Sequence, residues 1–362
     1  MNDGNLLIRL LPFQLAETAA GTLIRRGALR LMLDGDGIAE IVARLQEVAS
    51  DAFCSRHDLL ALFPPIDRPR VDALLRELAI RRLAELRGPG APTDAAPRHE
   101  DSEDVFFWQL GMTRDQIRSA TGGRIALVGV NALSLALIEH LGRYGSWQAV
   151  LIDDVPLRNH ALYERGLPAG LTIVDAAEAD EAVRAANIVV ACAEFGGLGL
   201  LKPWNALAAA ENRPFLPVIV EDLTARLGPL SIPDETACLE CLDARQNSHL
   251  KGRPSDRRLM EEILARGQDV SGTHPALIAM AAPLAAFELL RFAADLLPRR
   301  VGKLIELNLM GSSMVASRVL KAPRCPVCSP MKHAGKLALE KVALNPERWA
   351  EVEAMGGPDG PR

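Results

Sequence analysis

The sequence predicts an α/β protein in which a small α+β domain precedes a larger, doubly wound parallel sheet. Three short strand patterns followed by three helical patterns fill the first part of the 362-residue chain. Further on, continuous apolar runs alternate with helical stretches, which is typical of parallel sheets covered by helices on both faces. Two Cys-x-x-Cys motifs lie in the C-terminal part of that second region. With 49% hydrophobic residues, the chain can bury the cores of two or three domains.

The N-terminal domain is expected to span residues 1–87 and to have a winged-helix outline. Its strands are predicted at Leu6–Pro12, Thr22–Arg26 and Leu29–Leu33, and the last two are joined around Gly27 as a hairpin. Helical patterns follow at Ile38–Val48, His57–Phe63 and Pro69–Leu86. The third pattern has apolar residues at three- and four-residue steps, and its proline lies in the first turn, where proline is tolerated.

The remainder of the chain divides by composition. Residues 88–104 (GPGAPTDAAPRHEDSED) are rich in glycine, proline, alanine and acids and are predicted to form a linker. The second domain is expected at residues 105–330. The C-terminal tail, residues 331–362, holds one helical pattern (Leu337–Met355) and ends in GGPDGPR, which we expect to fray.

The second domain opens with a strand over Arg124–Val130, a helix over Ser134–Gly142 and a strand over Ala149–Ile152 that ends in Asp153 and Asp154. The remaining buried strands are expected at Ile173–Val174, Asn187–Ala191 and Pro217–Val220, and the helical stretches at Ala176–Ala186 and Pro203–Ala210. Strands that alternate with helices in this way form a parallel, doubly wound sheet.

The charge and hydropathy of the chain argue against several kinds of partner. A net charge of −5 is unusual for a general nucleic-acid binder, because such proteins are strongly basic. The apolar stretch Ala276–Leu290 contains Pro283 and Glu288 and is shorter than the about 20 residues that span a bilayer. The N-terminus has no signal-peptide pattern. We therefore expect a cytoplasmic protein without nucleic-acid or membrane partners.

The four cysteines of the two motifs, Cys238-Leu-Glu-Cys241 and Cys325-Pro-Val-Cys328, have the spacing of paired metal knuckles. Two such turns complete a tetrahedral four-sulfur zinc site, whose closed shell leaves no open position and is therefore structural. In a reducing compartment this pattern favours metal over disulfides. The alternative is two unrelated redox or packing pairs. Cys54 and Cys192 stand alone in apolar surroundings and are expected to be packing residues.

The turn after the first strand of the second domain is a weak candidate for a phosphate loop. Such a loop needs G-x-G-x-x-G, because the second glycine lets the backbone approach phosphate and the third lets the helix pack closely. Here Gly129 is the first glycine, and Asn131 and Ser134 stand at the other two positions. The sequence therefore favours a Rossmann-like scaffold that holds no nucleotide.

The order of several short motifs resembles the ThiF/MoeB family of adenylating enzymes over about residues 105–330. The motifs are a RIALVG strand, a strand ending in IDD, the run VVACAEFGG, Asn205, then CLECL and PRCPVC. The resemblance implies a ThiF-type doubly wound sheet with the four-cysteine zinc site.

The resemblance also implies where a nucleotide site would lie. Asp153 or Asp154 takes the position of the ribose acid, Arg158 that of the triphosphate arginine, and Glu194 that of the magnesium aspartate. The family's triphosphate lysine has no counterpart, because the first lysine of the chain is Lys202. Together with Gly129, these residues form a vestigial nucleotide site. We expect no ATP cofactor and no catalytic residues.

A small strand-and-helix domain ahead of such a core, with VLKAPRCPVCSP near the end, resembles the partner proteins of azoline-forming cyclodehydratases. The resemblance implies that the N-terminal domain is the recognition element for a ribosomal precursor peptide, while a separate YcaO-type subunit uses ATP to form thiazoline and oxazoline rings. The alternative is a ThiF-like enzyme that itself adenylates a peptide or carboxylate. The missing lysine and glycines favour the first function. The sequence does not determine whether the chain forms a homodimer. It also does not determine the precursor, its modified residues or the product class (linear azole peptide or thiopeptide).

Peptide recognition needs an exposed strand edge next to a helix, so that an extended segment adds to the sheet as a further strand. The strand Leu29–Leu33 and the helix from Pro69 supply both elements. The predicted peptide-binding residues are Leu29, Arg30, Leu31, Met32, Leu33, Arg70, Leu74, Glu77 and Arg81. A packing or dimerisation module is one alternative. A DNA-binding winged helix is another, which the twelve arginines against twelve acids in residues 1–87 disfavour.

Overall fold

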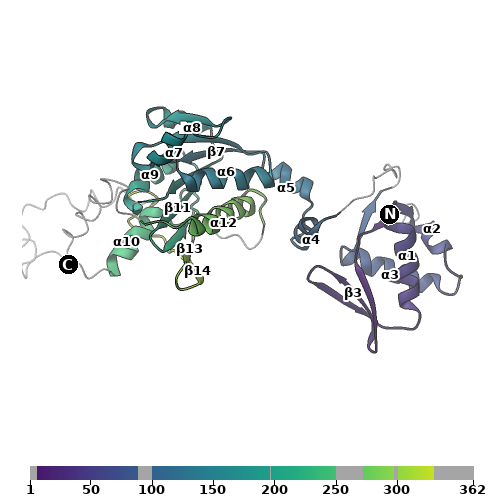
Figure 1. Ribbon diagram of the computed structural model, residues 1–362. Helices are drawn as coiled ribbons and strands as arrows, with labels where there is room; N and C mark the ends of the chain where they lie inside the picture. The colour runs from purple at the N-terminus through teal and green to yellow at the C-terminus, as the bar shows by residue number, and fades with distance from the viewer. Residues whose placement is uncertain (1–5, 89–99, 196, 250–271, 297–300, 330–362) are drawn as a thin grey trace, which may run out of the picture. The chain divides into compact units, whose positions relative to one another are not determined.

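The computed structural model describes residues 6–88, 100–195, 197–249, 272–296 and 301–329 (Figure 1). The chain forms two compact units, residues 1–115 and 116–362. The first unit thus extends beyond the domain predicted at 1–87 and includes a helix, α4 (Ser102–Gln109), that begins in the predicted linker 88–104. The tail 331–362, with its helical pattern Leu337–Met355, lies outside the described residues.

The first unit contains two three-stranded antiparallel sheets. One has the order β5-β1-β6 and consists of β1 (Leu7–Leu10), β5 (Cys54–Ser55) and β6 (Ala84–Arg87). The other has the order β2-β3-β4 and consists of β2 (Gln14–Thr18), β3 (Gly21–Arg26) and β4 (Leu29–Leu33). The predicted hairpin of β3 and β4 is confirmed. Its two-residue turn places Gly27 at φ 56°, a left-handed conformation that glycine adopts without a steric cost.

Three further helices of the first unit are α1 (Ile38–Ala49), α2 (Arg56–Ala61) and α3 (Arg68–Ile80). Their buried faces enclose one apolar core with β1 and β3, which includes Ile8, Ile24, Val42, Leu45, Leu59, Val71, Leu75 and Leu78. The three predicted helices are thus present, but the prediction for the last one, Pro69–Leu86, is wrong after Ile80. The helix ends at Ile80, and Arg82 has a left-handed φ of 59°. Ala84–Arg87 then pair with β1 as β6, because this long-range pairing overrides the local helical pattern.

The second unit has an eight-stranded sheet with the order β14-β13-β12-β11-β10-β7-β8-β9. The parallel strands are β7 (Arg124–Val128), β8 (Gln148–Asp153), β9 (Thr172–Asp175), β10 (Ile188–Ala193) and β11 (Phe215–Glu221). They confirm the predicted parallel sheet. Three antiparallel strands that the sequence pattern did not predict extend it: β12 (Thr224–Leu227), β13 (Lys303–Asn308) and β14 (Ser313–Arg318).

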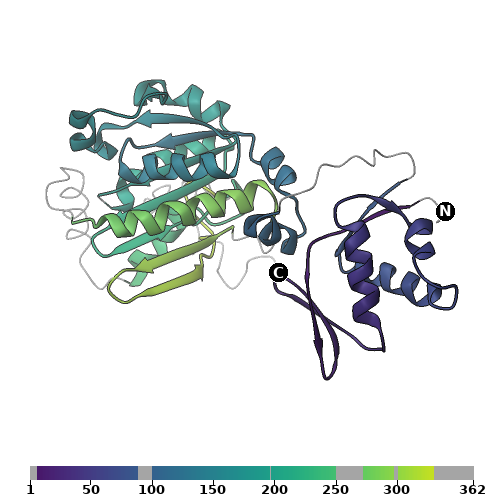
Figure 2. The same cartoon turned by 45° about the vertical axis from the view of Figure 1, so that its right-hand side comes forward.

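Helices cover both faces of this sheet, as a doubly wound fold requires. On one face lie α6 (Ala132–Tyr144) and α12 (Pro275–Ala293), whose ribbons run side by side in Figure 2. On the other face lie α8 (Ala179–Ala185), α9 (Lys202–Ala210) and α10 (Leu239–His249). The shorter elements are α5 (Arg114–Ala120), α7 (His160–Arg165) and the 3-10 turns η2 (Val155–Leu157), η3 (Ala176–Glu178) and η4 (Leu198–Leu201).

The helix α12 is longer than the apolar stretch Ala276–Leu290 that we considered. Its 19 residues have a mean hydropathy of 1.7 in the most apolar window, so by length and composition alone it qualifies as a membrane span. Half of that window is buried inside the protein. Leu277, Ala281 and Leu289 of this helix are fully buried and pack into the apolar core beside the sheet.

Candidate functional site

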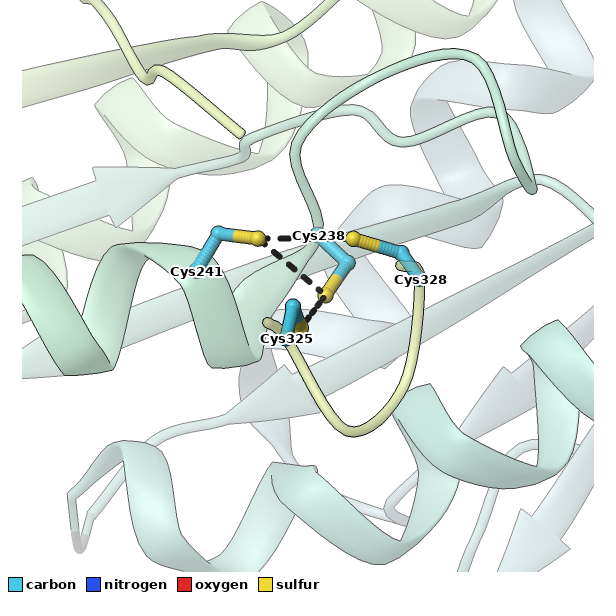
Figure 3. A group of neighbouring side chains, drawn as sticks. All are labelled: Cys238, Cys241, Cys325 and Cys328. Atoms are coloured by element: carbon cyan, nitrogen blue, oxygen red, sulfur yellow. Dashed lines mark hydrogen bonds between the residues drawn. The ribbon is translucent and has the colours of Figure 1, made fainter. Parts of the chain in front are cut away.

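The four cysteines of the two knuckles meet in one cluster (Figure 3). The Sγ–Sγ distance is 3.6 Å between Cys238 and Cys325, 3.4 Å between Cys241 and Cys328, and 4.0 Å between Cys238 and Cys241. Four sulfurs about 2.3 Å from a tetrahedral zinc ion lie about 3.8 Å from one another. The cluster therefore suits a structural zinc ion.

Local structure explains how segments 87 residues apart present these thiols to a common centre. Cys238 directly precedes α10, and Cys241 lies in the first turn of that helix. The other two cysteines lie in the turn that follows β14, and the backbone N–H of Ala322 donates to Cys241 Sγ over 3.3 Å. All four residues are at most 3% exposed. The donor set is closed by protein sulfurs, which is the arrangement of a structural rather than a catalytic zinc.

The two remaining cysteines lie outside this cluster. Cys192 is fully buried in the core of the second unit, where burial raises the pKa of its thiol well above the usual range. Cys54 is half-buried in the first unit, and burial, followed by the charge of Asp58, raises its pKa as well. Both thiols are therefore poor nucleophiles, since the thiolate is the reactive form.

The turn after β7 is closed by side chains of the chain itself. A Cβ atom at Gly129 (φ 94°) would lie 2.5 Å from the carbonyl oxygen of Cys192, so glycine is required here by packing within the protein. Asn131 is fully buried and caps α6 by accepting from the N–H of Ser134 over 3.0 Å. Its Nδ2 donates to the carbonyls of Leu157 (3.0 Å) and Cys192 (2.8 Å). The residue at the second glycine position thus joins the start of α6 to strand β10 and to the turn that follows β8.

The N-terminus of α6, where a Rossmann-type protein binds phosphate, is occupied by a carboxylate. Glu194 follows β10, and its Oε2 accepts from the backbone N–H of Ala132 over 2.7 Å. Its Oε1 accepts from Asn159 Nδ2 over 2.9 Å. Burial raises the pKa of Glu194, while these hydrogen bonds oppose the rise. Glu194, the counterpart of the magnesium aspartate, is therefore hydrogen-bonded to the N-terminus of α6, where a phosphate group would bind, and to Asn159.

The two acids at the end of β8, Asp153 and Asp154, are also paired within the chain. Asp153 accepts from Arg158 Nε (2.9 Å) and Nη2 (2.8 Å) and from the hydroxyl of Tyr163. Burial, followed by this hydrogen bond, raises the pKa of Tyr163 to about 12. Asp154 accepts from Trp204 Nε1 over 2.7 Å, and burial raises its pKa. The candidate ribose acid and triphosphate arginine therefore neutralise each other.

The residues of the predicted vestigial site all lie at the C-terminal ends of β7, β8 and β10: Gly129, Asp153, Asp154, Arg158 and Glu194. The sequence motifs indicate their neighbourhood but do not reveal four residues that hold it closed: Asn131 in its bonding role, Asn159, Tyr163 and Trp204. An Asn followed by Ser three residues later is a capping signal for α6 that the sequence does contain.

The predicted peptide-binding strand, β4, lies at one edge of its sheet among the residues that the structure describes. Arg26 and Leu29 flank a two-residue turn and pair with each other, so Leu29, Leu31 and Leu33 bond to β3. By alternation, the N–H and C=O groups of Arg30 and Met32 point away from β3 toward the open edge. The three leucine side chains pack against the core of the unit, and the side chains of Arg30 and Met32 are exposed.

The predicted residues of α3 form a stripe with steps of four, three and four residues: Arg70, Leu74, Glu77 and Arg81. Leu74 is buried, and Glu77 Oε1 pairs with Arg81 Nε over 2.8 Å on the exposed part of the helix. A Cβ atom at Gly35 would lie 2.4 Å from Arg70 Nη2. The start of α3 therefore lies beside the chain that leaves β4.

Comparisons with known proteins identify the fold. No protein-family model and no curated protein matches the sequence. The structure of E. coli MccB with AMPCPP and MccA has a TM-score of 0.62 and 17% identity, covering 89% of this chain and 99% of that one. The Microcin C7 biosynthetic enzyme MccB in complex with N-formylated MccA has a TM-score of 0.63 and 16% identity, covering 89% and 100%. The heterocyclase TruD has a TM-score of 0.59 and 16% identity, covering 96% of this chain but 47% of TruD. These likenesses show that the chain has an MccB-like α/β fold.

Proposed function

We propose that this chain is the leader-binding, non-catalytic partner of a YcaO-type cyclodehydratase subunit, which uses ATP to form thiazoline or oxazoline rings in a ribosomally made peptide. The observation that carries the proposal is the edge strand β4, whose outward backbone groups at Arg30 and Met32 bond to no other described strand. An extended leader segment would pair with these groups, and its alternate side chains would contact the face beside α3. The proposal is supported by the fold shared with MccB, which has been solved with MccA, and with a heterocyclase solved with substrate and cofactor.

The second unit supports a non-catalytic role. At the position for phosphate, the N-terminus of α6 bonds Glu194 instead, and Arg158 is neutralised by Asp153. A nucleotide would have to displace both carboxylates, and the chain offers no lysine before Lys202 to compensate. We therefore propose that the isolated chain uses no ATP and that this unit serves as a scaffold, with one zinc ion at the cysteine cluster.

A non-catalytic protein that binds the leader still raises the rate of ring formation by its partner enzyme. Holding the leader on this chain turns the encounter between the core peptide and the YcaO-type subunit into an intramolecular step, with an effective concentration set by the length of the peptide between them. Two exposed arginines, Arg70 on α3 and Arg81 directly after it, would attract acidic leader residues. Each such exposed pair contributes less than about 1 kcal/mol, so main-chain pairing with β4 carries most of the affinity.

The test begins with a search of the neighbouring genes for a YcaO-type reading frame and a short Cys/Ser/Thr-rich precursor. This chain is then reconstituted with the two products of that search. With ATP and magnesium, mass spectrometry should show the loss of one water per ring only when this chain is present. Ring formation at the same rate without this chain would contradict the proposal.

The alternative function, adenylation of a peptide or carboxylate by this chain itself, is favoured by one observation. The fold matches that of MccB solved with AMPCPP over 89% of the present chain. Exchange of labelled pyrophosphate into ATP, measured with this chain, magnesium and the precursor, separates the two functions. Robust exchange without a YcaO-type subunit would establish the alternative.

A further inference from the structure

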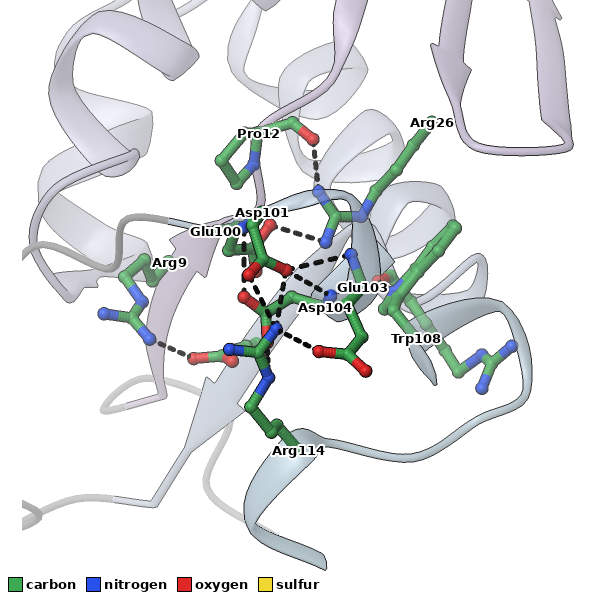
Figure 4. Close-up of polar contacts among 11 residues, drawn as sticks. Arg9, Pro12, Arg26, Glu100, Asp101, Glu103, Asp104, Trp108 and Arg114 are labelled. Atoms are coloured by element: carbon green, nitrogen blue, oxygen red, sulfur yellow. Dashed lines mark hydrogen bonds and ion pairs between the residues drawn. The ribbon is translucent and has the colours of Figure 1, made fainter. Parts of the chain in front are cut away.

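The segment Glu100–Gln109 bonds specifically to the rest of the first unit, although its beginning has the composition of a linker (Figure 4). The helix α4 starts with a capping box, in which Asp101 accepts from the N–H of Asp104 and the Asp104 side chain accepts from the N–H of Asp101. Phe107 is 2% exposed, and Trp108 packs against the apolar core of the unit. The segment is therefore an ordered part of the unit that contains β4.

One set of bonds joins this segment to the turn that precedes β4. Gln109 Oε1 accepts from the backbone N–H of Ala28 over 2.9 Å, and a Cβ atom at Gly27 would lie 2.8 Å from Gln109 Cδ. The guanidinium of Arg26, whose side chain is 2% exposed, pairs with Glu100 over 2.6 Å and lies 4.7 Å from the ring centroid of Trp108. The turn between β3 and β4 is thus bonded to the segment through the backbone of Ala28 and through the side chain of Arg26, the last residue of β3.

A second bond joins the same segment to the end of α3. Trp108 Nε1 donates to the carbonyl oxygen of Arg82 over 2.8 Å. Arg82 follows α3 by two residues and has the left-handed φ that ends the helix. At the opposite end of the helix, Arg70 lies against Gly35, just after β4. The helix α3 therefore runs antiparallel to β4, and the segment connects the turn before the strand to the residue Arg82 that follows the helix.

We propose that Glu100, Trp108 and Gln109, which we call the α4 clasp, are positioning residues that hold β4 and α3 at the separation a bound leader peptide requires. This inference rests on the proposed function, since it assumes that the leader lies along β4 and contacts α3. The clasp itself does not touch the leader. It acts by keeping the turn before β4 and the carbonyl of Arg82 attached to one rigid helix.

The expected loss of leader affinity follows from the fraction of molecules in which β4 and α3 have the spacing that leader binding requires. If loss of one clasp bond lowers the fraction of molecules with β4 and α3 correctly spaced to roughly one tenth, the apparent Kd for the leader rises about tenfold. The bonds to be removed are single neutral hydrogen bonds on the surface of the unit, so the fold itself should survive their loss.

The test measures leader binding and backbone protection in the full-length chain. Trp108→Phe keeps the ring beneath Arg26 but removes the donor to Arg82, and Gln109→Ala removes the acceptor for Ala28. Ser102→Ala, an exposed change on the same helix, is the matched control. The probe is the fluorescently labelled precursor peptide used in the reconstitution described above, and hydrogen exchange of residues 28–33 and 78–82 is followed without peptide.

Both clasp variants should weaken binding about tenfold and speed exchange in the turn and at the end of α3, while the control matches the wild type. Equal leader affinity for the wild type and both clasp variants would overturn the inference alone, whatever the exchange rates. Failure of the wild-type chain to bind the peptide would overturn the proposed function and this inference with it.

Discussion

Replacement of Glu194 tests whether this carboxylate occupies the place of a nucleotide phosphate. In Glu194→Ala, the backbone N–H of Ala132 and the Nδ2 of Asn159 lose their acceptors, which lie at 2.7 and 2.9 Å in the wild type. A buried donor left without a partner costs about 1–3 kcal/mol. Because both donors are half-buried and water replaces part of each bond, we expect a loss of about 2–4 kcal/mol.

For a unit of this size, each kcal/mol lowers the Tm by about 2–4 °C, so the expected fall is roughly 4–16 °C. Differential scanning calorimetry measures it directly. An exposed acid on α7, Glu164→Ala, is the matched control and should leave the Tm unchanged.

The decisive feature of the assay is rescue by anions. The vacated N-terminus of α6 should accept phosphate or sulfate, because unpaired N–H groups and the helix dipole favour an anion there. Added phosphate should therefore raise the Tm of Glu194→Ala more than that of the wild type or the control. If Glu194→Ala unfolds at the wild-type temperature, or if phosphate stabilises all three proteins equally, the assignment of Glu194 is wrong.

Two further predictions concern the other candidate centres. Metal analysis should find about one zinc per chain. Cys325→Ser should lose the zinc and unfold readily because zinc binding is coupled to folding, whereas the control Cys54→Ser should retain it. Soluble, folded wild-type protein without zinc would contradict this prediction. The carboxyl of Asp101 should titrate at about pH 2 by NMR, because hydrogen bonds from Arg114, followed by that from the N–H of Asp104, lower its pKa from 3.8. The stabilisation from this pair is complete above pH 3.8 and is lost as the pH falls toward 2; Arg114→Gln should return the midpoint toward 3.8, and an unchanged midpoint would refute the cause.

The features that the sequence predicted correctly are those encoded over short distances. Parallel strands such as β7 and β10 contain a continuous apolar run, and the hairpin at Gly27 has a glycine where the turn needs a positive φ. The cysteine cluster was predictable because each knuckle supplies two ligands from one local turn.

The features that the sequence did not reveal depend on contacts between residues far apart in the chain. Ala84–Leu86 continue the predicted helical pattern but pair with β1, more than seventy residues earlier in the chain. The position of Glu194 as the counterpart of the magnesium aspartate stays a prediction. Its bond to α6 was not predictable, because it joins residues 62 positions apart. The helix α4 begins within a stretch that is rich in proline and acids, yet Asp101 and Asp104 are spaced as a capping box that marks its start.

Leader binding to the β4 edge is the central claim, and one titration tests it most directly. Met32→Pro removes an outward backbone N–H on β4, and Glu17→Pro removes the equivalent outward N–H on β2, at the opposite edge of the same sheet. Both prolines perturb the sheet alike, but only Met32→Pro interrupts the proposed pairing.

Fluorescence anisotropy with the labelled precursor and the full-length chain compares the three proteins. Met32→Pro should weaken binding by about tenfold or more, since about 1.4 kcal/mol corresponds to one such factor, while Glu17→Pro should bind like the wild type. If Met32→Pro binds the precursor as tightly as the wild type, or if Glu17→Pro weakens binding as much, the leader does not pair with β4.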